Sequence, residues 1–159
     1  MKKILIILLG VIIVFAITGC SVKKSSDKLN DNIKIGKESN INITDKNITL
    51  KIKEGTLTNT GAVIVLDNNS DITISFGEDY WLEIEQDGKW YSLKTINDFV
   101  VNTPLYHLKP SESKEKSVNW GYAFGKFPRG KYRITKGITL EFENDKKEYA
   151  FVVGEFAIN

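Results

Sequence analysis

The chain has 159 residues, with 22 basic and 20 acidic side chains, one cysteine and one histidine. Two of the basic residues, Lys2 and Lys3, lie in a segment that we expect to be removed. The rest of the chain then has 20 basic and 20 acidic side chains and is formally neutral. It has no concentrated positive charge for binding nucleic acid. A lone cysteine excludes an internal disulfide, and a lone histidine excludes a zinc site built from several histidines.

The N-terminus has the pattern of an export signal. Lys2 and Lys3 precede an apolar run over residues 4–16, which is shorter than the roughly 20 residues of a membrane-spanning helix. The run ends in Ile17-Thr18-Gly19-Cys20 and resembles a bacterial lipoprotein signal. The resemblance implies cleavage before Cys20 and a diacylglyceryl group on its sulfur. The alternatives are a buried free thiol and a permanent signal anchor.

We therefore predict a signal peptide over residues 1–19 and a lipid anchor at Cys20, on the extracytoplasmic face of a Gram-positive-like cell membrane. Residues 21–46 are rich in Lys, Asn, Asp and Ser and contain no aromatic side chain. Such a segment buries too little apolar surface to fold alone, so we predict a disordered tether over residues 20–46. The alternation of Ile41 and Ile43 with polar residues leaves open a first edge strand there.

From residue 47 onward apolar residues alternate with polar ones, which predicts half-buried strands near residues 48–52, 62–66 and 72–76. Residues 80–93 form the clearest hairpin, because Asp87-Gly88 suits a two-residue type I′ turn. Its register places Ile84 opposite Tyr91, and it places Trp81 on the same side as Trp90, away from the apolar face.

Further strands are predicted over residues 114–120, around Tyr132 and Ile134, and over 138–142, which would pair with 149–153 across a polar loop. Short strands in this number, with almost no helical periodicity, predict an all-β antiparallel sandwich of about 7–9 strands over residues 47–159.

Tyr132 is a candidate tyrosine corner, because Phe127-Pro128-Arg129-Gly130-Lys131-Tyr132 has the spacing at which a phenol bonds back to nearby backbone. The domain also resembles the bacterial Ig-like domains of lipoproteins. The segments that carry the resemblance are Leu82-Glu83-Ile84 before Gly88-Lys89-Trp90-Tyr91, the turn over residues 108–113, Trp120, residues 128–134 and residues 155–158. The resemblance implies an extracytoplasmic Ig-like sandwich without catalytic residues.

No pattern in the chain predicts an enzyme, a metal site or a cofactor. Ser111 and Lys114 have the spacing of an acylation motif, but they follow Pro110 in a polar turn. Glu83 and Glu85 alternate as a solvated strand face. His107 has no second ligand cluster, and the oxygen-rich residues 67–71 fit a turn better than a calcium loop.

Four aromatic residues are the candidate binding residues: Trp81, Trp90, Tyr122 and Phe124. They would form an exposed surface for a protein partner or for glycan stacking, unless they fill the sandwich. We predict a non-catalytic binding or structural module that contacts another envelope protein. The alternative is a receptor for a cell-wall glycan or a small solute.

Overall fold

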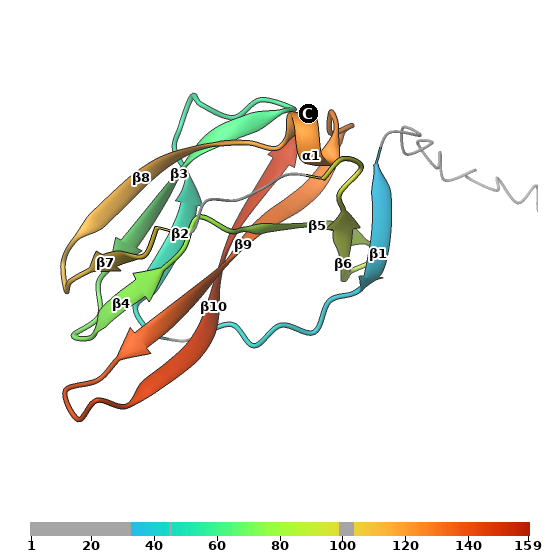
Figure 1. Ribbon diagram of the computed structural model, residues 1–159. Coiled ribbons are helices and arrows are strands. Elements are labelled where there is room, and N and C mark those ends of the chain that lie inside the picture. The colour runs from blue at the N-terminus through green and yellow to red at the C-terminus, as the bar shows by residue number, and fades with distance from the viewer. Residues whose placement is uncertain (1–32, 45, 99–103) are drawn as a thin grey trace, which may run out of the picture.

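The computed structural model describes residues 33–44, 46–98 and 104–159, and they form two packed β-sheets (Figure 1). The elements in chain order are β1 (Lys34–Glu38), β2 (Ile48–Ile52), β3 (Gly61–Asn68), β4 (Thr73–Phe76), β5 (Trp81–Gln86), β6 (Lys89–Lys94), β7 (Tyr106–Leu108), β8 (Ser113–Asn119), α1 (Gly121–Phe124), β9 (Gly130–Glu141) and β10 (Lys147–Ile158).

The larger sheet has the strand order β1-β6-β5-β9-β4-β7, and β10 pairs with the other edge of β9. The smaller sheet has the order β2-β3-β8. Every pair of named strands is antiparallel, which confirms the predicted sandwich. The described residues contain ten strands, more than the 7–9 expected, because β1 and the short β7 add to the set.

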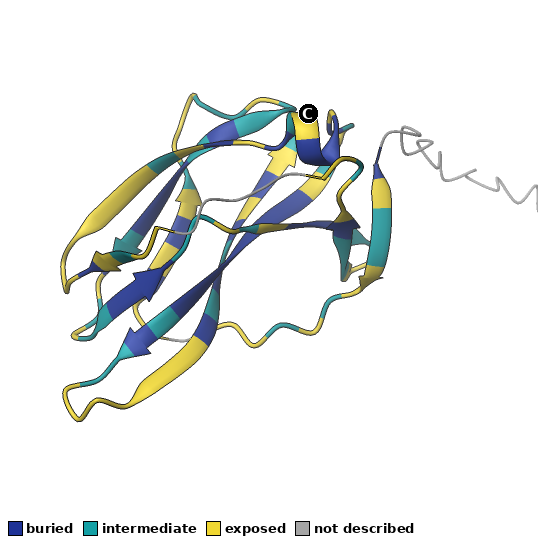
Figure 2. Cartoon of the chain, in the orientation of Figure 1, coloured by how far each residue is buried: buried dark blue, intermediate teal, exposed yellow. Residues whose placement is uncertain are grey.

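The core lies between the two sheets, and in β2 it follows the predicted alternation. In β2, Ile48 and Leu50 are buried while Thr49 and Lys51 are exposed. β9 is buried over most of its length (Figure 2), and its core residues include Tyr132, Ile134, Ile138 and Leu140. Gly154 of β10 lets β2 approach closely, since a Cβ atom there would lie 2.8 Å from the Leu50 carbonyl oxygen.

Four aromatic rings stack at the end of the core near α1. Tyr132 stacks on Phe127 with 4.6 Å between ring centroids and on Phe156 with 5.7 Å, and Trp120 stacks on both of those phenyl rings. The Tyr132 hydroxyl donates to the Pro128 carbonyl oxygen at 3.0 Å, which is the backbone bond of a tyrosine corner. Burial raises the pKa of Tyr132 to about 12.

The β5–β6 hairpin has the register that the sequence predicts: Ile84 lies opposite Tyr91, Glu83 opposite Ser92 and Glu85 opposite Trp90. Asp87 and Gly88 form the turn with φ of 50° and 78°, as a type I′ turn requires. Leu82 and Ile84 face the core, so Trp81 and Glu83 face the opposite side of the sheet.

The N-terminal part of the described chain differs from the prediction of a tether up to residue 46. Ile33 is buried, and β1 pairs with β6 through Ile35 and Leu93. Residues 34–38 have the composition of a coil, but they form a strand because β6 offers an open edge for backbone pairing. The folded region therefore begins before residue 47. The signal peptide, Cys20 and residues 21–32 lie outside the described residues.

A strap, residues 39–44, leads from β1 to the far edge of β10 (Figure 1). At one end of the strap the Ser39 amide donates to the Trp90 carbonyl oxygen at 2.8 Å. At the other end the Thr44 amide donates to the Phe151 carbonyl oxygen at 2.9 Å. Ile43 forms a parallel bridge with Phe151. The predicted first edge strand near Ile41 and Ile43 is reduced to this single bridge.

Within the described ranges, no helix is long and apolar enough to cross a membrane.

Candidate binding site on the outer face of the large sheet

The side of the larger sheet that faces away from the core is here called the outer face. Cross-strand pairing sets its residues: Trp81 of β5 lies opposite Thr135 of β9, and Glu83 lies opposite Arg133. On β10 the outward residues include Phe151 and Tyr149. Most sheet faces of this kind are solvated, but here several polar side chains are buried.

Glu83 and Arg133 form an ion pair on the outer face, and 4% and 7% of their side chains are exposed. The Arg133 Nε donates to a Glu83 carboxylate oxygen. The Trp90 ring covers the guanidinium, whose carbon lies 4.5 Å from the ring centroid. The sequence prediction of a solvated face is therefore wrong for Glu83, because Arg133, 50 residues away, supplies the ion-pair partner of the buried carboxylate.

A cavity of about 220 Å³ lies between the strap and the sheet. The outer-face residues that line it are Trp81, Glu83, Ser92, Thr135 and Phe151, and β1 and the strap contribute Lys37, Glu38, Ser39 and Ile41. Thr135 is 1% exposed, and its Oγ1 has no hydrogen-bond partner within the described part of the chain.

Three aromatic side chains continue from this cavity along the outer face, and they are here called the aromatic row: Trp81, Phe151 and Tyr149. Phe151 lies in the middle, with Trp81 at 5.8 Å and 75° and Tyr149 at 5.1 Å and 79°. Trp81 is 43% exposed and Tyr149 is 58% exposed. Ile43 of the strap, also exposed, pairs with Phe151.

The structure separates the four aromatic residues that the sequence grouped. Trp81 belongs to the aromatic row, while Trp90 lies over Arg133 on the same face. Tyr122 is 67% exposed on α1, at another part of the molecule. Phe124 is buried against the core and packs on Tyr80, so it is not part of an exposed surface.

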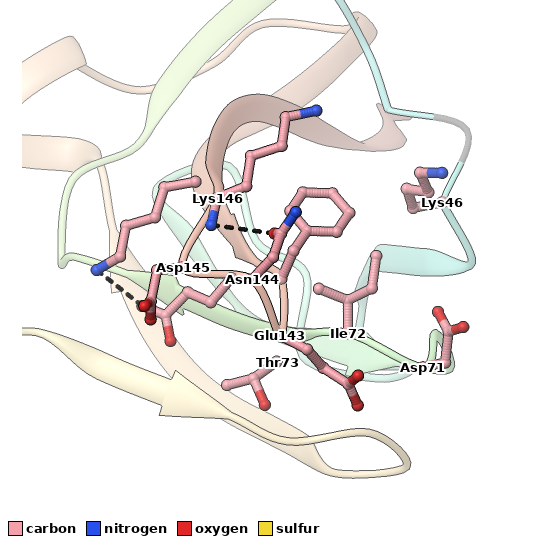
Figure 3. Close-up of a pocket in the computed structure, with 11 residues that line it drawn as sticks. Lys46, Asp71, Ile72, Thr73, Glu143, Asn144, Asp145 and Lys146 are labelled. Carbon is pink, nitrogen blue, oxygen red and sulfur yellow. Dashed lines mark hydrogen bonds and ion pairs between the residues drawn. The ribbon is translucent and has the colours of Figure 1, made fainter.

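A larger groove, of about 1,160 Å³, lies between the tip of the β9–β10 hairpin and the turn before β4 (Figure 3). Its lining residues are exposed or half-buried and carry both signs of charge, such as Lys147 beside Glu141 at 3.8 Å. Nothing there removes a ligand from water. We therefore do not treat this groove as the functional site.

The remaining polar candidates have structural roles. Asn68, the last residue of β3, is fully buried, and its side-chain amide donates across the following turn to the Ile72 carbonyl oxygen at 2.8 Å and to the Leu108 carbonyl oxygen at 3.0 Å. This agrees with a turn rather than a calcium loop. His107 lies 3.4 Å from a Glu141 oxygen, and Ser111 sits in a tight turn with φ of 65°. No group of three metal-ligating residue types occurs in the described ranges.

Lys136 is a buried cation on the core side of β9 and is 2% exposed. Its Nζ donates to the carbonyl oxygens of Gly77 at 2.7 Å and Asp79 at 2.9 Å. Burial lowers its pKa from 10.5 to about 8, although the nearby Asp79 carboxylate opposes the shift. It reaches neither the cavity under the strap nor the aromatic row.

The comparison with protein families gives a direct result. The model of the bacterial Ig-like domain matches residues 44–151. The chain belongs to this family. The match begins where the strap ends and runs from β2 into the first part of β10, so β1 and nearly all of the strap precede it. No curated protein matches the chain.

Bacterial Ig-like domains are generally structural or binding modules, and the family match suggests this role for the chain. The binding function of this Ig-like domain must then be sought on its surface. The hairpin register, available from the sequence, already places Trp81, Glu83 and Trp90 on one face. The alternation of Ile41 and Ile43 is the one sequence signal within the strap, but it does not predict that the strap crosses the outer face. The sequence contains no signal for Arg133 as the partner of Glu83, because that contact is nonlocal.

Proposed function

We propose that this protein is a lipid-anchored, extracytoplasmic binding module that contacts another envelope protein. The bacterial Ig-like family supports the module, and the Ile17-Thr18-Gly19-Cys20 sequence supports a lipid on Cys20. Two or three acyl chains would hold the domain firmly at the membrane surface. Its local concentration there would favour even weak contacts with neighbouring membrane proteins.

The exposed aromatic row is the observation that best supports a protein partner. Trp and Tyr dominate the residues that contribute most to protein interfaces, and both Trp81 and Tyr149 are about half exposed. A flat platform for polysaccharides needs neighbouring rings that are coplanar, but the middle ring of the row, Phe151, is tilted by 75° from Trp81 and by 79° from Tyr149. This corrugated apolar surface suits the aliphatic side chains of a protein segment.

Photo-crosslinking in cells tests the partner. A photoreactive phenylalanine at Ile43, beside the row, should crosslink a discrete envelope protein, identified by mass spectrometry. The Trp81→Ala/Tyr149→Ala variant should abolish that crosslink. Tyr122→Ala is the matched control, because Tyr122 is also an exposed tyrosine but lies on a different part of the domain. An identical crosslink in the double variant would refute the aromatic row as the interface.

The anchor has a separate test. Cells fed an alkyne-labelled fatty acid should label the wild-type chain, and Cys20→Ala should remove the label and release the protein from the membrane fraction. An unlabelled wild-type chain would refute the lipid anchor and leave the aromatic-row result unaffected.

A further inference from the structure

The cavity under the strap contains a buried hydroxyl with no partner. Leaving a buried donor or acceptor unsatisfied costs about 1–3 kcal/mol. A valine has nearly the shape of a threonine and would fill the place of Thr135 on a strand without that cost. The Thr135 Oγ1, 1% exposed and on the cavity wall, therefore points to a hydrogen-bonding ligand.

Glu83 supplies a second polar group of the cavity wall, and burying its carboxylate also costs free energy of folding. The Glu83 carboxylate is buried beside the cavity, and one of its oxygens accepts from Arg133. Replacing such pairs with apolar residues is often neutral or stabilising, so stability alone does not explain the pair. Arg133 cancels the charge of Glu83, and Lys37 and Glu38 of β1, which also line the cavity, add one charge of each sign. This balance favours a neutral ligand with several hydroxyl groups over an ion.

The third component of the wall is apolar. Trp81 and Phe151 line the cavity on the side of the aromatic row, and Ile41 lines it from the strap. A pyranose ring combines hydroxyl groups at its edge with a C–H face that packs on aromatic rings. The volume of about 220 Å³ is below the roughly 300–1,000 Å³ of pockets for drug-sized ligands, so it accommodates one ring.

We propose that the cavity between the strap and the outer face binds one pyranose ring, with Thr135 and Glu83 bonding its hydroxyl groups and Trp81 packing on its C–H face. The ring is either a free monosaccharide or the end of a glycan chain. The proposal rests on the binding-module role of the domain but not on a protein partner, since Tyr149 does not line the cavity.

Saturation-transfer difference NMR on the full chain, in a detergent without a sugar headgroup, tests the proposal. The probes are D-glucose, N-acetyl-D-glucosamine and its trisaccharide, with D-sorbitol as an acyclic polyol. We expect saturable binding of at least one cyclic sugar and at least tenfold weaker binding of sorbitol. A trisaccharide that binds as well as its monosaccharide identifies a chain end, and one that does not identifies a free sugar.

Two variants on the same strand complete the experiment. Thr135→Val should weaken sugar binding at least tenfold while raising the melting temperature, since it removes the unpartnered hydroxyl. Thr139→Val is the matched control, because Thr139 lies on the same face of β9 outside the cavity and should leave binding unchanged. No saturable binding of any cyclic sugar, equal binding of sorbitol, or undiminished binding by Thr135→Val would each overturn the proposal. A Tyr149→Ala single variant, which keeps Trp81, should lose the crosslink and keep sugar binding, and that result would separate the two sites.

Discussion

Removing one partner of the Glu83–Arg133 pair should destabilise the domain by about 3–5 kcal/mol, since it leaves a buried charge uncompensated. The side chains are 4% and 7% exposed, so solvent screens the remaining charge little. The loss is a large share of the 5–15 kcal/mol that stabilises a typical domain. We expect this cost for Glu83→Leu and for Arg133→Met.

The double variant Glu83→Leu/Arg133→Met should cost less than either single variant, because it removes both charges and keeps apolar volume. It still loses the contact between the guanidinium and the Trp90 ring, a cation–π interaction worth about 0.5–2 kcal/mol. The double variant should therefore lower the free energy of unfolding by about 1 kcal/mol. The double-mutant cycle would then give a strong coupling energy between the two side chains.

Urea denaturation followed by tryptophan fluorescence measures all four free energies of unfolding. The control pair is Lys131–Glu155, 3.0 Å apart on β9 and β10 and about half exposed at both side chains. Lys131→Met and Glu155→Gln should each cost no more than about 1 kcal/mol. If the double variant at Glu83 and Arg133 costs the sum of its singles, or if the singles match the surface control, the reasoning from burial is wrong.

Three further predictions concern the core. For Lys136, the folded pKa of about 8 lies below the unfolded value of 10.5, so the native state loses its proton first and stability should rise between pH 8 and 10, by at most about 2–3 kcal/mol. Lys136→Met should flatten this rise in urea titrations, and a rise that persists would contradict the assignment; above pH 10, Tyr132, with its raised pKa, should lower stability again. Tyr132→Phe should lower the free energy of unfolding by about 1–2 kcal/mol, because the Pro128 carbonyl loses its donor. An unchanged urea midpoint would show that this hydrogen bond does not stabilise the domain. Gly154→Ala should cost about 1–3 kcal/mol by pushing β10 from the Leu50 backbone, and calorimetry showing no loss would mean that the sheets separate freely.

The predictable parts of the fold are those that local chemistry decides. Asp87-Gly88 sets the turn and with it the hairpin register, and the alternation of Ile48 and Leu50 with polar residues sets β2. The Phe127 to Tyr132 spacing brings the Tyr132 hydroxyl to the Pro128 carbonyl oxygen.

The candidate site depended on contacts that are distant in the sequence. The residues of β1 look like coil, and only the open edge of β6 makes them a strand. Glu83 looks solvated until Arg133 is placed beside it. Phe124 and Tyr122 are two residues apart, yet one is buried and the other exposed, because the short helix α1 turns them to different sides.

On the proposed lipid anchor, the early start of the folded region would limit how far the domain stands from the membrane. Cys20 lies 13 residues before Ile33, the first described and already buried residue. Even fully extended, 13 residues span only roughly 43–47 Å. If the folded domain began at Asn47, the segment that connects it to Cys20 would reach roughly twice as far. With a lipid on Cys20, anything that the outer face binds must therefore come close to the bilayer surface, which excludes partners confined to the outer layers of a thick wall.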